Sequence, residues 1–207
     1  MAHKGSAHTL EDTFALLDAI EMDLEYIKGR NPRLLLEIGS GSGCVATFAA
    51  SALGSSSLLY CCTDINQLAT STTKKTGNQN KVLLDPIQTS LASGLNQRCY
   101  RAIDVLLFNP PYVPTEEEEV EHGQDTPNIQ SSWAGGSMGM HITDILLDQL
   151  DSLLSPKGCC YLVTVAQNRP KEIMERVRAK HGLESSVILS RRAGGEHLHI
   201  LRFSRPE

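Results

Sequence analysis

The sequence predicts an α/β fold, a doubly wound sheet of about seven mostly parallel strands with an antiparallel edge strand and helices on both faces. Three observations predict it. Apolar runs of strand length alternate with helical stretches along the chain. The run Leu34-Leu35-Leu36-Glu37-Ile38 is followed at once by a glycine-rich turn and a helical stretch, the first half of a nucleotide-binding βαβ unit. The last two predicted strands are joined by a connection short enough for an antiparallel hairpin.

The composition is that of one globular domain. The chain has 207 residues, 41% of them hydrophobic and 21% charged, so we expect a single domain over 1–207, with 1–10 as a flexible segment. The net charge is −5 and the basic residues are scattered, which argues against a large DNA-binding face. No apolar run is long enough to span a bilayer, and the first residues lack the apolar stretch of a signal peptide. We expect a cytoplasmic protein without membrane association, with the nucleus as an open alternative.

The first half of the chain contains most of the predicted strands. A helix begins at Thr9, which can cap it, and Gly29, Asn31 and Pro32 end it. Its apolar positions recur at helical spacing, at Phe14, Leu17, Ile20, Leu24 and Ile27. The elements that follow are strand 34–38, helix 44–53, strand 58–63, a helix from 66 to about 75, strand 81–87, a mainly irregular stretch 89–101 and strand 102–108.

The second half begins with a long polar segment, 113–139. Its acidic run, Glu116 to Glu119, is interpreted as a solvated loop, and ordering around a basic substrate or partner is the alternative. Trp133 is interpreted as a packing anchor. The remaining pattern predicts helix 141–154, a turn at 155–158, strand 159–165, helix 170–180 and strands 184–189 and 197–203.

The cysteine pattern does not predict a metal site. The six cysteines are Cys44, Cys61, Cys62, Cys99, Cys159 and Cys160. None forms a C-x-x-C motif, and the two adjacent pairs lie in apolar strand-like runs. We therefore expect buried, reduced thiols rather than zinc ligands or disulfides.

The most informative stretch is Phe108-Asn109-Pro110-Pro111-Tyr112, at the end of an apolar strand. Neither proline can donate a backbone hydrogen bond, and Pro110 restricts Asn109, so the chain must leave the sheet in a stiff, extended turn. This turn offers two fixed acceptors, the side-chain carbonyl of Asn109 and the backbone carbonyl of Pro110. They can hold both N–H bonds of a planar NH2 group while the ring of Tyr112 packs against it. The stretch therefore predicts an amino-group-binding site.

The turn Gly39-Ser40-Gly41-Ser42-Gly43 alone does not distinguish among nucleotide-binding families. Cys44 stands where a dinucleotide fold would place its third glycine. Glu37 lies just before the turn, well placed for a cationic sulfonium or amino group. Asp64 ends the second strand, at the position that binds ribose hydroxyls. Because open sheets bind ligands at the carboxyl ends of their strands, these residues predict one site.

Together these motifs resemble the class I S-adenosylmethionine-dependent methyltransferases of the amino-group type, which have a single Rossmann-like domain. The resemblance narrows to the eukaryotic and archaeal HemK-like branch, the catalytic subunit that methylates the glutamine of the Gly-Gly-Gln motif in class 1 translation release factors. The stretches that carry it are Glu11-Asp12-Thr13-Phe14, Leu36 to Gly43, Cys62-Thr63-Asp64-Ile65-Asn66, Phe108 to Val113, Trp133-Ala134-Gly135-Gly136 and Leu154 to Gly158.

This resemblance implies N5-methylation of a protein glutamine, with S-adenosyl-L-methionine as the cofactor and a class 1 release factor as the substrate. It also implies a heterodimer with a small zinc-binding activator protein. The positions that match cofactor contacts are Thr13, Glu37, Gly39, Gly41, Asp64, Ile65, Ser90, Leu91 and Asn109. The substrate clamp matches Asn109, Pro110, Pro111 and Tyr112, of which Asn109, Pro110 and Tyr112 are the expected catalytic residues. The chain departs from the family at Ser90, where the family has an aspartate near the adenine, and at Ala7-His8-Thr9, where it has a tyrosine and a proline.

Other reactions stay open on the residues alone. The same clamp suits N6 of an adenine flipped out of DNA or RNA and stacked on Tyr112, although the acidic balance argues against a nucleic acid. Protein-lysine methylation, of a histone for example, is a further alternative, but a lysine amine needs no two-acceptor clamp. The non-enzymatic alternative is a scaffold that binds the cofactor without turnover. The intact clamp, Asn109 to Tyr112, argues against it.

Overall fold

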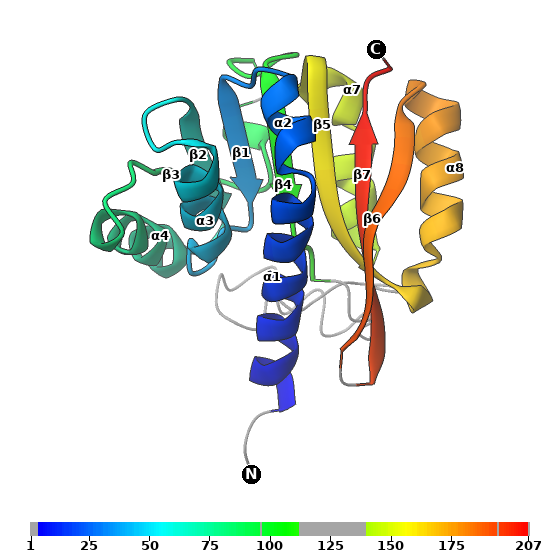
Figure 1. The fold of residues 1–207 in the computed structure, drawn as a ribbon, viewed down its shortest axis with the longest axis horizontal. Coiled ribbons are helices and arrows are strands. Elements are labelled where there is room, and N and C mark those ends of the chain that lie inside the picture. The colour runs from blue at the N-terminus through cyan, green and yellow to red at the C-terminus, as the bar shows by residue number, and fades with distance from the viewer. Residues whose placement is uncertain (1–3, 96, 112–139, 194, 207) are drawn as a thin grey trace.

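Seven strands form one mixed sheet in the computed structural model, which describes residues 4–95, 97–111, 140–193 and 195–206 (Figure 1). The order across the sheet is β3-β2-β1-β4-β5-β7-β6. The strands are β1 (Leu34–Ile38), β2 (Leu59–Asp64), β3 (Asp85–Gln88), β4 (Ile103–Phe108), β5 (Leu154–Val165), β6 (Glu184–Ala193) and β7 (Glu196–Ser204). Strands β1 to β5 pair in parallel, and β7 runs antiparallel to both β5 and β6. The predicted sheet is confirmed, with its antiparallel strand one place in from the β6 edge.

Helices cover both faces of the sheet, as predicted. They are α1 (Lys4–Met22), α2 (Leu24–Gly29), α3 (Cys44–Leu53), α4 (Gln67–Gln79), α6 (His141–Leu147), α7 (Leu150–Leu153) and α8 (Pro170–His181), with 3-10 turns η1 (Ser93–Leu95) and η4 (Ala166–Asn168). The front layer in Figure 1, α1 to α3, packs on one face with Leu35, Val105 and Leu107. The helices α6, α7 and α8 pack on the other face with Leu36, Leu106 and Leu162. Because both faces are buried, the central strands are apolar throughout.

The first helix differs from the prediction at both ends. It begins at Lys4, earlier than Thr9, so most of the segment predicted to be flexible is helical. It is also interrupted at Asp23, before α2 begins. The Asp23 carboxylate accepts hydrogen bonds from the Tyr161 hydroxyl and from Arg202, each at 2.6 Å. These bonds hold the interruption against β5 and β7.

The predicted apolar positions of the first helical stretch are confirmed at Ile20 and Ile27, which are buried, and at Leu17, which packs against the core, and the prediction is wrong at Phe14. Phe14, which was grouped with the core positions, is 55% exposed. The face that contacts the sheet carries Ala15, Leu16, Ala19 and Ile20. Two alanines on this face let α1 lie close to the strands, so the pattern of large apolar residues alone was incomplete.

Strand β3 is shorter than predicted. The prediction placed a strand over 81–87, but the N–H of Val82 donates to the carbonyl of Gly77 at 3.0 Å, which ties this stretch to α4. Pairing with β2 begins only at Asp85. Pro86 is compatible with β3 because this strand is the edge of the sheet and needs no hydrogen-bond donor on its open side.

The predicted turn at 155–158 is a bulge inside β5. Ile103 pairs with Leu154 and Val105 pairs with Cys159, so the intervening residues of β5 loop out of the register. A Cβ atom at Gly158 would lie 2.6 Å from the carbonyl oxygen of Ile103, so only glycine fits this close approach. The predicted helix 141–154 is divided into α6 and α7.

Five of the six cysteines are buried, as predicted, and Cys44 is exposed, contrary to the prediction. Burial raises the pKa of Cys61 to about 11 and that of Cys159 to about 12, so these thiols are neutral at physiological pH. Within the described ranges, no His, Cys, Asp and Glu side chains form a group of three or more that could hold a metal. No helix in this part of the chain is long and apolar enough to cross a membrane.

Candidate active site

The carboxyl ends of β1, β2 and β4 lie level with one another. Ile38, at the end of β1, pairs with Thr63 of β2 and with Phe108 of β4. The stretches that follow these strands therefore begin at one edge of the sheet, the lower edge in Figure 1. Ligands bind at this edge in open α/β sheets. The predicted convergence of the glycine turn, the end of β2 and the asparagine-proline turn is thus confirmed.

The glycine turn bends back onto the end of β2. The N–H groups of Gly39 and Ser40 both donate to the carbonyl of Thr63, at 2.8 and 3.0 Å. Gly39 has a φ of +69°, and a Cβ atom built on it would meet no other atom within 4 Å. The backbone therefore faces open space here, and a ligand can approach it closely.

Asp64 joins this turn to α4. One of its carboxylate oxygens accepts the N–H of Gly41 at 3.0 Å, and the other accepts the N–H of Asn66 at 2.9 Å. Asn66 in turn caps α4 by accepting the N–H of Leu68 at 2.8 Å. The carboxylate is thus oriented by backbone donors. Each of its oxygens keeps a second acceptor site, so it can still accept a ribose hydroxyl.

Glu37 lies in β1 under the first turn of α3, and it is only 5% exposed. Its carboxyl oxygen Oε2 accepts the N–H of Ala46 at 2.9 Å. Burial raises the pKa of Glu37 to about 8, the bond from Ala46 opposes this change, and the charge of Asp64 adds to it. The carboxyl group is therefore mainly protonated at neutral pH, and a cation placed beside it would favour its ionised form.

Asn109 carries an unusual buried acceptor. Its side-chain oxygen Oδ1 is buried and has no hydrogen-bond partner in the described part of the chain. Pro110, which follows, is buried as well. Leaving an amide oxygen buried and unbonded costs about 1–3 kcal/mol, and such oxygens are rare. The position is explained if a donor from a bound molecule completes the bond.

Glu37 and Asn109 lie on the same face of the sheet. In β4, Val105 and Leu107 face the layer of α1 and α3, and Asn109 follows in the same alternation. Glu37 is paired with Leu107 across the two strands. The buried carboxyl group of Glu37 and the side-chain oxygen of Asn109, which has no partner among the described residues, are therefore two neighbouring polar groups at the carboxyl end of this face.

The predicted contacts at the end of β3 gather beside Asp64. The N–H of Thr89 donates to the Asp64 carbonyl at 3.0 Å, which brings this loop against the end of β2. Ile65 is 42% exposed, Ser90 is exposed, and Leu91 packs against the core with a φ of +48°. An apolar side chain and a hydroxyl thus lie within reach of one ligand. Ser90 can donate one hydrogen bond but lacks the charge of an aspartate.

Some predicted residues are separate from this group or fall outside the described ranges. Thr13 lies on α1 and is half-buried. Tyr112 lies outside the described residues, so its predicted packing against the substrate stays a prediction. The acidic run 116–119 and Trp133 also lie outside them.

One residue beside the site, Thr73, was not predicted from the sequence. Thr73 of α4 is completely buried, and its Oγ1 lies 2.8 Å from the Oγ of Ser40 in the glycine turn. The signal that could have revealed it is a run of small hydroxyl residues, 70–73, in a predicted helix with few large apolar residues. Such a helix can pack close to a turn.

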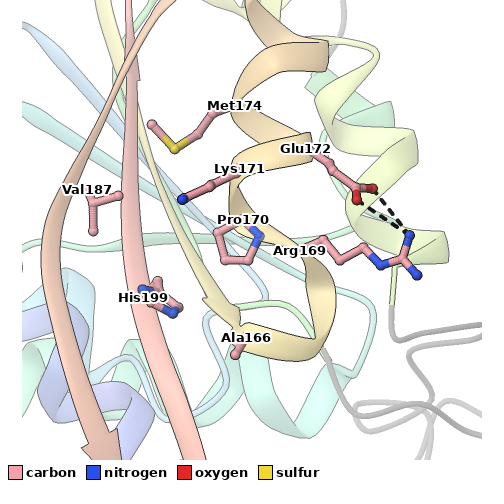
Figure 2. A pocket seen from close by; sticks show the side chains of 8 residues that line it. All are labelled: Ala166, Arg169, Pro170, Lys171, Glu172, Met174, Val187 and His199. Carbon is pink, nitrogen blue, oxygen red and sulfur yellow. Dashed lines mark hydrogen bonds and ion pairs between the residues drawn. The ribbon is translucent and has the colours of Figure 1, made fainter.

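A second hollow lies on the other face of the sheet, between α8 and the strands β6 and β7. Figure 2 shows Lys171, Met174, Val187 and His199 around it, while Arg169 and Glu172 pair with each other on the outer side of α8. Burial, with a smaller effect of His197, lowers the pKa of His199. Since α8 packs on the face opposite to Glu37, this hollow is separate from the site described above.

The residues at the carboxyl edge fit S-adenosyl-L-methionine, the cofactor that the resemblance implied. Open space in front of Gly39 leaves room beside the glycine turn. The buried carboxyl group of Glu37 is stabilised in its ionised form by a nearby positive charge. Asp64 and Ile65 offer a carboxylate and an apolar surface next to each other. The donor set contains no feature that demands a metal.

Comparisons with known proteins agree with this geometry. The methyltransferase small domain family model matches residues 13–126. The methyltransferase HEMK2 of Homo sapiens is 44% identical over 94% of this chain and 87% of the relative. The eRF1 methyltransferase catalytic subunit mtq2 of Schizosaccharomyces pombe is 40% identical over the same shares. Mtq2 in the E. cuniculi Mtq2-Trm112 complex has the same fold, with a TM-score of 0.68 and 24% identity over 95% of this chain and 96% of that one.

Proposed function

Because this chain belongs to the methyltransferase small domain family, with HEMK2 and Mtq2 methyltransferases among its relatives, we propose that it methylates a class 1 translation release factor. The acceptor is the side-chain nitrogen, N5, of the glutamine in the Gly-Gly-Gln motif. S-adenosyl-L-methionine is the methyl donor. The observation that carries this proposal is the buried side-chain oxygen of Asn109, just after β4, which has no hydrogen-bond partner among the described residues.

A primary amide needs positioning more than it needs a base. Its nitrogen is a poor nucleophile because the lone pair is delocalised into the carbonyl group. The turn after β4 contains no histidine, lysine or cysteine that could act as a strong base. The side-chain oxygen of Asn109 and the backbone carbonyl of Pro110 are acceptors for the two N–H bonds of the amide. Holding both bonds orients the lone pair, and such positioning contributes on the order of 7–11 kcal/mol in favourable cases.

The cofactor supplies an electrophilic methyl group on a positively charged sulfur. On this chain, Glu37 provides a buried carboxyl group for the cationic part of the molecule. The turn at Gly39 and Gly41 provides room and backbone contacts, and Asp64 provides acceptors for ribose hydroxyls. Ile65, Ser90 and Leu91 would lie against the adenine. The extra proton on the methylated nitrogen leaves after the transfer, to water or a nearby acceptor.

The proposed substrate is favoured over the alternatives by the relatives. The S. pombe relative is a catalytic subunit that acts on eRF1, a release factor. The net charge of −5 disfavours a nucleic acid, and a lysine amine has no use for two fixed acceptors. A glutamine side chain uses both acceptors and presents a flat amide, which suits a clamp built from Asn109 and Pro110.

We further propose that the chain works in the cytoplasm as a heterodimer with a small zinc-binding activator. The E. cuniculi relative was solved as a complex with Trm112. In this chain, Leu83 is 78% exposed and Leu59 is 53% exposed. Leu59 begins β2, and Leu83 lies in the stretch that leads into β3, two residues before Asp85, which pairs with Cys61 of β2. Apolar side chains on an open sheet edge are typical of a surface that a partner covers.

The partner surface is tested by co-purification. Changing Leu59 and Leu83 together to aspartate should strongly reduce the amount of activator that co-purifies with the tagged chain. Val187→Asp is the matched control, because Val187 is also an exposed apolar residue but lies on β6, at the opposite edge of the sheet. Equal loss of activator in the control would contradict the assignment to the β3 edge.

The enzymatic proposal is tested by site-mapped mass spectrometry. The chain, co-expressed with its activator, is incubated with S-adenosyl-L-methionine and a class 1 release factor. We expect one added methyl group, on the glutamine of the Gly-Gly-Gln motif, and none with Asn109→Ala. Methylation at another residue, or cofactor binding with no methylated glutamine, would show that the substrate assignment is wrong.

A further inference from the structure

One residue of α4, Thr73, forms hydrogen bonds with the glycine turn. Thr73 is completely buried, and Ser40, its partner in the turn, is 4% exposed. The two hydroxyl oxygens lie 2.8 Å apart, and Thr73 Oγ1 donates to the carbonyl of Gly41 at 3.3 Å. Both contacts are satisfied at once if the Ser40 hydroxyl donates to Thr73. One side chain thus connects two consecutive residues of the turn to the helix.

The backbone of α4 also lies directly against the turn. A Cβ atom at Gly43 would stand 2.8 Å from Cα of Thr73, closer than such atoms approach in real structures. Gly39, by contrast, faces open space. The turn therefore has a packed side, formed by Thr73, and an open side, on which a ligand can lie.

We propose that Thr73 is a positioning residue for cofactor binding, because its hydroxyl holds the glycine turn in the conformation that receives S-adenosyl-L-methionine. This inference rests on the proposed function, since it assumes that the turn binds this cofactor. Thr73 itself does not touch the ligand side of the turn. Its effect is transmitted through Ser40 and Gly41.

The physical reason is the freedom of the turn. Gly39, Gly41 and Gly43 all have positive φ angles, and glycine has more backbone conformations to lose than any other residue. A turn that is ordered before the ligand arrives does not lose this freedom on binding, which increases affinity. The N–H of Gly41 donates to the Asp64 carboxylate, and the carbonyl of Gly41 accepts from the Thr73 hydroxyl. Both backbone polar groups of Gly41 are therefore fixed by side chains.

The same helix offers a matched control. Thr70 is also buried, at 8% exposure, but its hydroxyl donates within the helix, to the carbonyl of Gln67 at 2.9 Å. Thr70→Val and Thr73→Val remove the same group from the same helix, and only the second removes a bond to the turn. Thr73→Ser keeps the hydroxyl and is the conservative variant.

The experiment compares these three variants with the wild type, each co-expressed with the activator. Calorimetry measures the Kd for S-adenosyl-L-methionine, steady-state kinetics give KM and kcat, and thermal unfolding gives Tm. For Thr73→Val we expect Kd and the cofactor KM to rise about three- to tenfold, the equivalent of one lost hydrogen bond. We expect kcat at saturating cofactor to stay within about twofold. Thr73→Ser should restore wild-type affinity, and Thr70→Val should leave Kd unchanged.

The outcomes separate this inference from the proposed function. If the wild-type complex binds the cofactor and Thr73→Val binds it equally well, the positioning role is wrong while the proposed function stands. If Thr70→Val weakens binding as much as Thr73→Val, the effect comes from the stability of α4 and the inference is overturned. If the wild-type complex does not bind the cofactor at all, the proposed function and this inference fail together.

Discussion

The two edges of the sheet differ in how their polar groups are partnered. At the amino edge, where the parallel strands begin, polar side chains are paired across long separations in the sequence. Asp104 accepts the N–H groups of Arg33 and Leu34, at 2.8 and 3.0 Å, and the hydroxyl of Ser155. Arg205 binds the Asp151 carboxylate at 2.9 Å. This edge, the upper one in Figure 1, is cross-linked by its polar groups.

At the carboxyl edge, several polar groups lack, among the described residues, the hydrogen bonds or ion pairs that would stabilise them. The side-chain oxygen of Asn109 is buried and has no partner within the described ranges, and burial raises the pKa of Glu37 to about 8. The glycine turn faces open space at Gly39. These features reduce stability in the free protein, and under the proposed function the binding of a cationic cofactor and an amide substrate would satisfy them. The comparison indicates that stability is concentrated at one edge and binding at the other.

The largest expected effect is the loss of activity when Asn109 is changed to alanine. Because this change removes one of two acceptors that orient the amide, we expect kcat/KM to fall by about a thousandfold or more, or about 4 kcal/mol. Stability should change little, because the removed oxygen has no partner in the described residues. Initial rates with the release factor and urea unfolding measure the two quantities. A large loss of stability with intact activity would reverse the roles assigned to the two edges.

The second prediction concerns the buried ion pair between Asp23, at the junction of α1 and α2, and Arg202 of β7. Asp23→Ala leaves the Arg202 guanidinium, which is 16% exposed, without its ion pair, and leaves the Tyr161 hydroxyl without an acceptor. Arg202 also lies 3.6 Å over the ring of Tyr26, so it cannot easily move into water. We expect the free energy of unfolding to fall by about 3–5 kcal/mol. Activity per folded molecule, measured below Tm, should stay close to that of the wild type, and a specific loss of kcat would contradict a purely structural role for this ion pair.

The third prediction is a pH dependence of stability that comes from Glu37. Below about pH 4.5 the carboxyl group is protonated in both the folded and the unfolded chain. Between there and about pH 8 the unfolded chain loses this proton while the folded chain keeps it, so stability falls as the pH rises. Glu37→Gln removes this dependence and should be more stable than the wild type by roughly 3 kcal/mol at pH 7.

Two measurements check the Glu37 prediction. Urea unfolding from pH 5 to 8 should show the advantage of Glu37→Gln growing with pH, and a difference that is constant with pH would be inconsistent with it. Cofactor binding should show the opposite ranking, because the variant has no charge to offer a cationic ligand. Proton release on cofactor binding, measured by calorimetry in buffers of different ionisation enthalpy, should disappear in Glu37→Gln.

The smallest expected change in the free energy of unfolding comes from a second Asp–Arg ion pair, which is more exposed than Asp23–Arg202. Asp18 of α1 pairs with Arg191 of β6, and the two side chains are 45% and 39% exposed. Exposed pairs contribute about 0–1 kcal/mol, so Asp18→Ala should lower the free energy of unfolding by no more than this. Measured beside Asp23→Ala, it tests whether burial decides how much an ion pair contributes to stability. Similar losses in both variants would show that burial is not the deciding factor.

Much of the site could be predicted because its residues follow strands in the sequence. Glu37, Gly39, Asp64 and Asn109 each occupy a position next to the end of an apolar run, and parallel strands bring these ends together by topology alone. The contributions of α1 and α4 could not be predicted in this way. Phe14 fits the helical apolar spacing but is exposed. The run of hydroxyl residues at 70–73 does not single out Thr73, which is completely buried beside the glycine turn.

The sequence by itself determined the fold class, the order of most elements and the edge at which the site lies, because hydrophobic period and turn chemistry are local properties of the chain. Only the tertiary structure decided which polar atoms have partners. It pairs Asp23 with Arg202, leaves Asn109 Oδ1 without a partner in the part of the chain that it describes, and packs Thr73 against the glycine turn. These facts depend on distances between residues far apart in the sequence. Desolvation and hydrogen bonding act over a few ångströms in space, so they are defined only once the chain is folded.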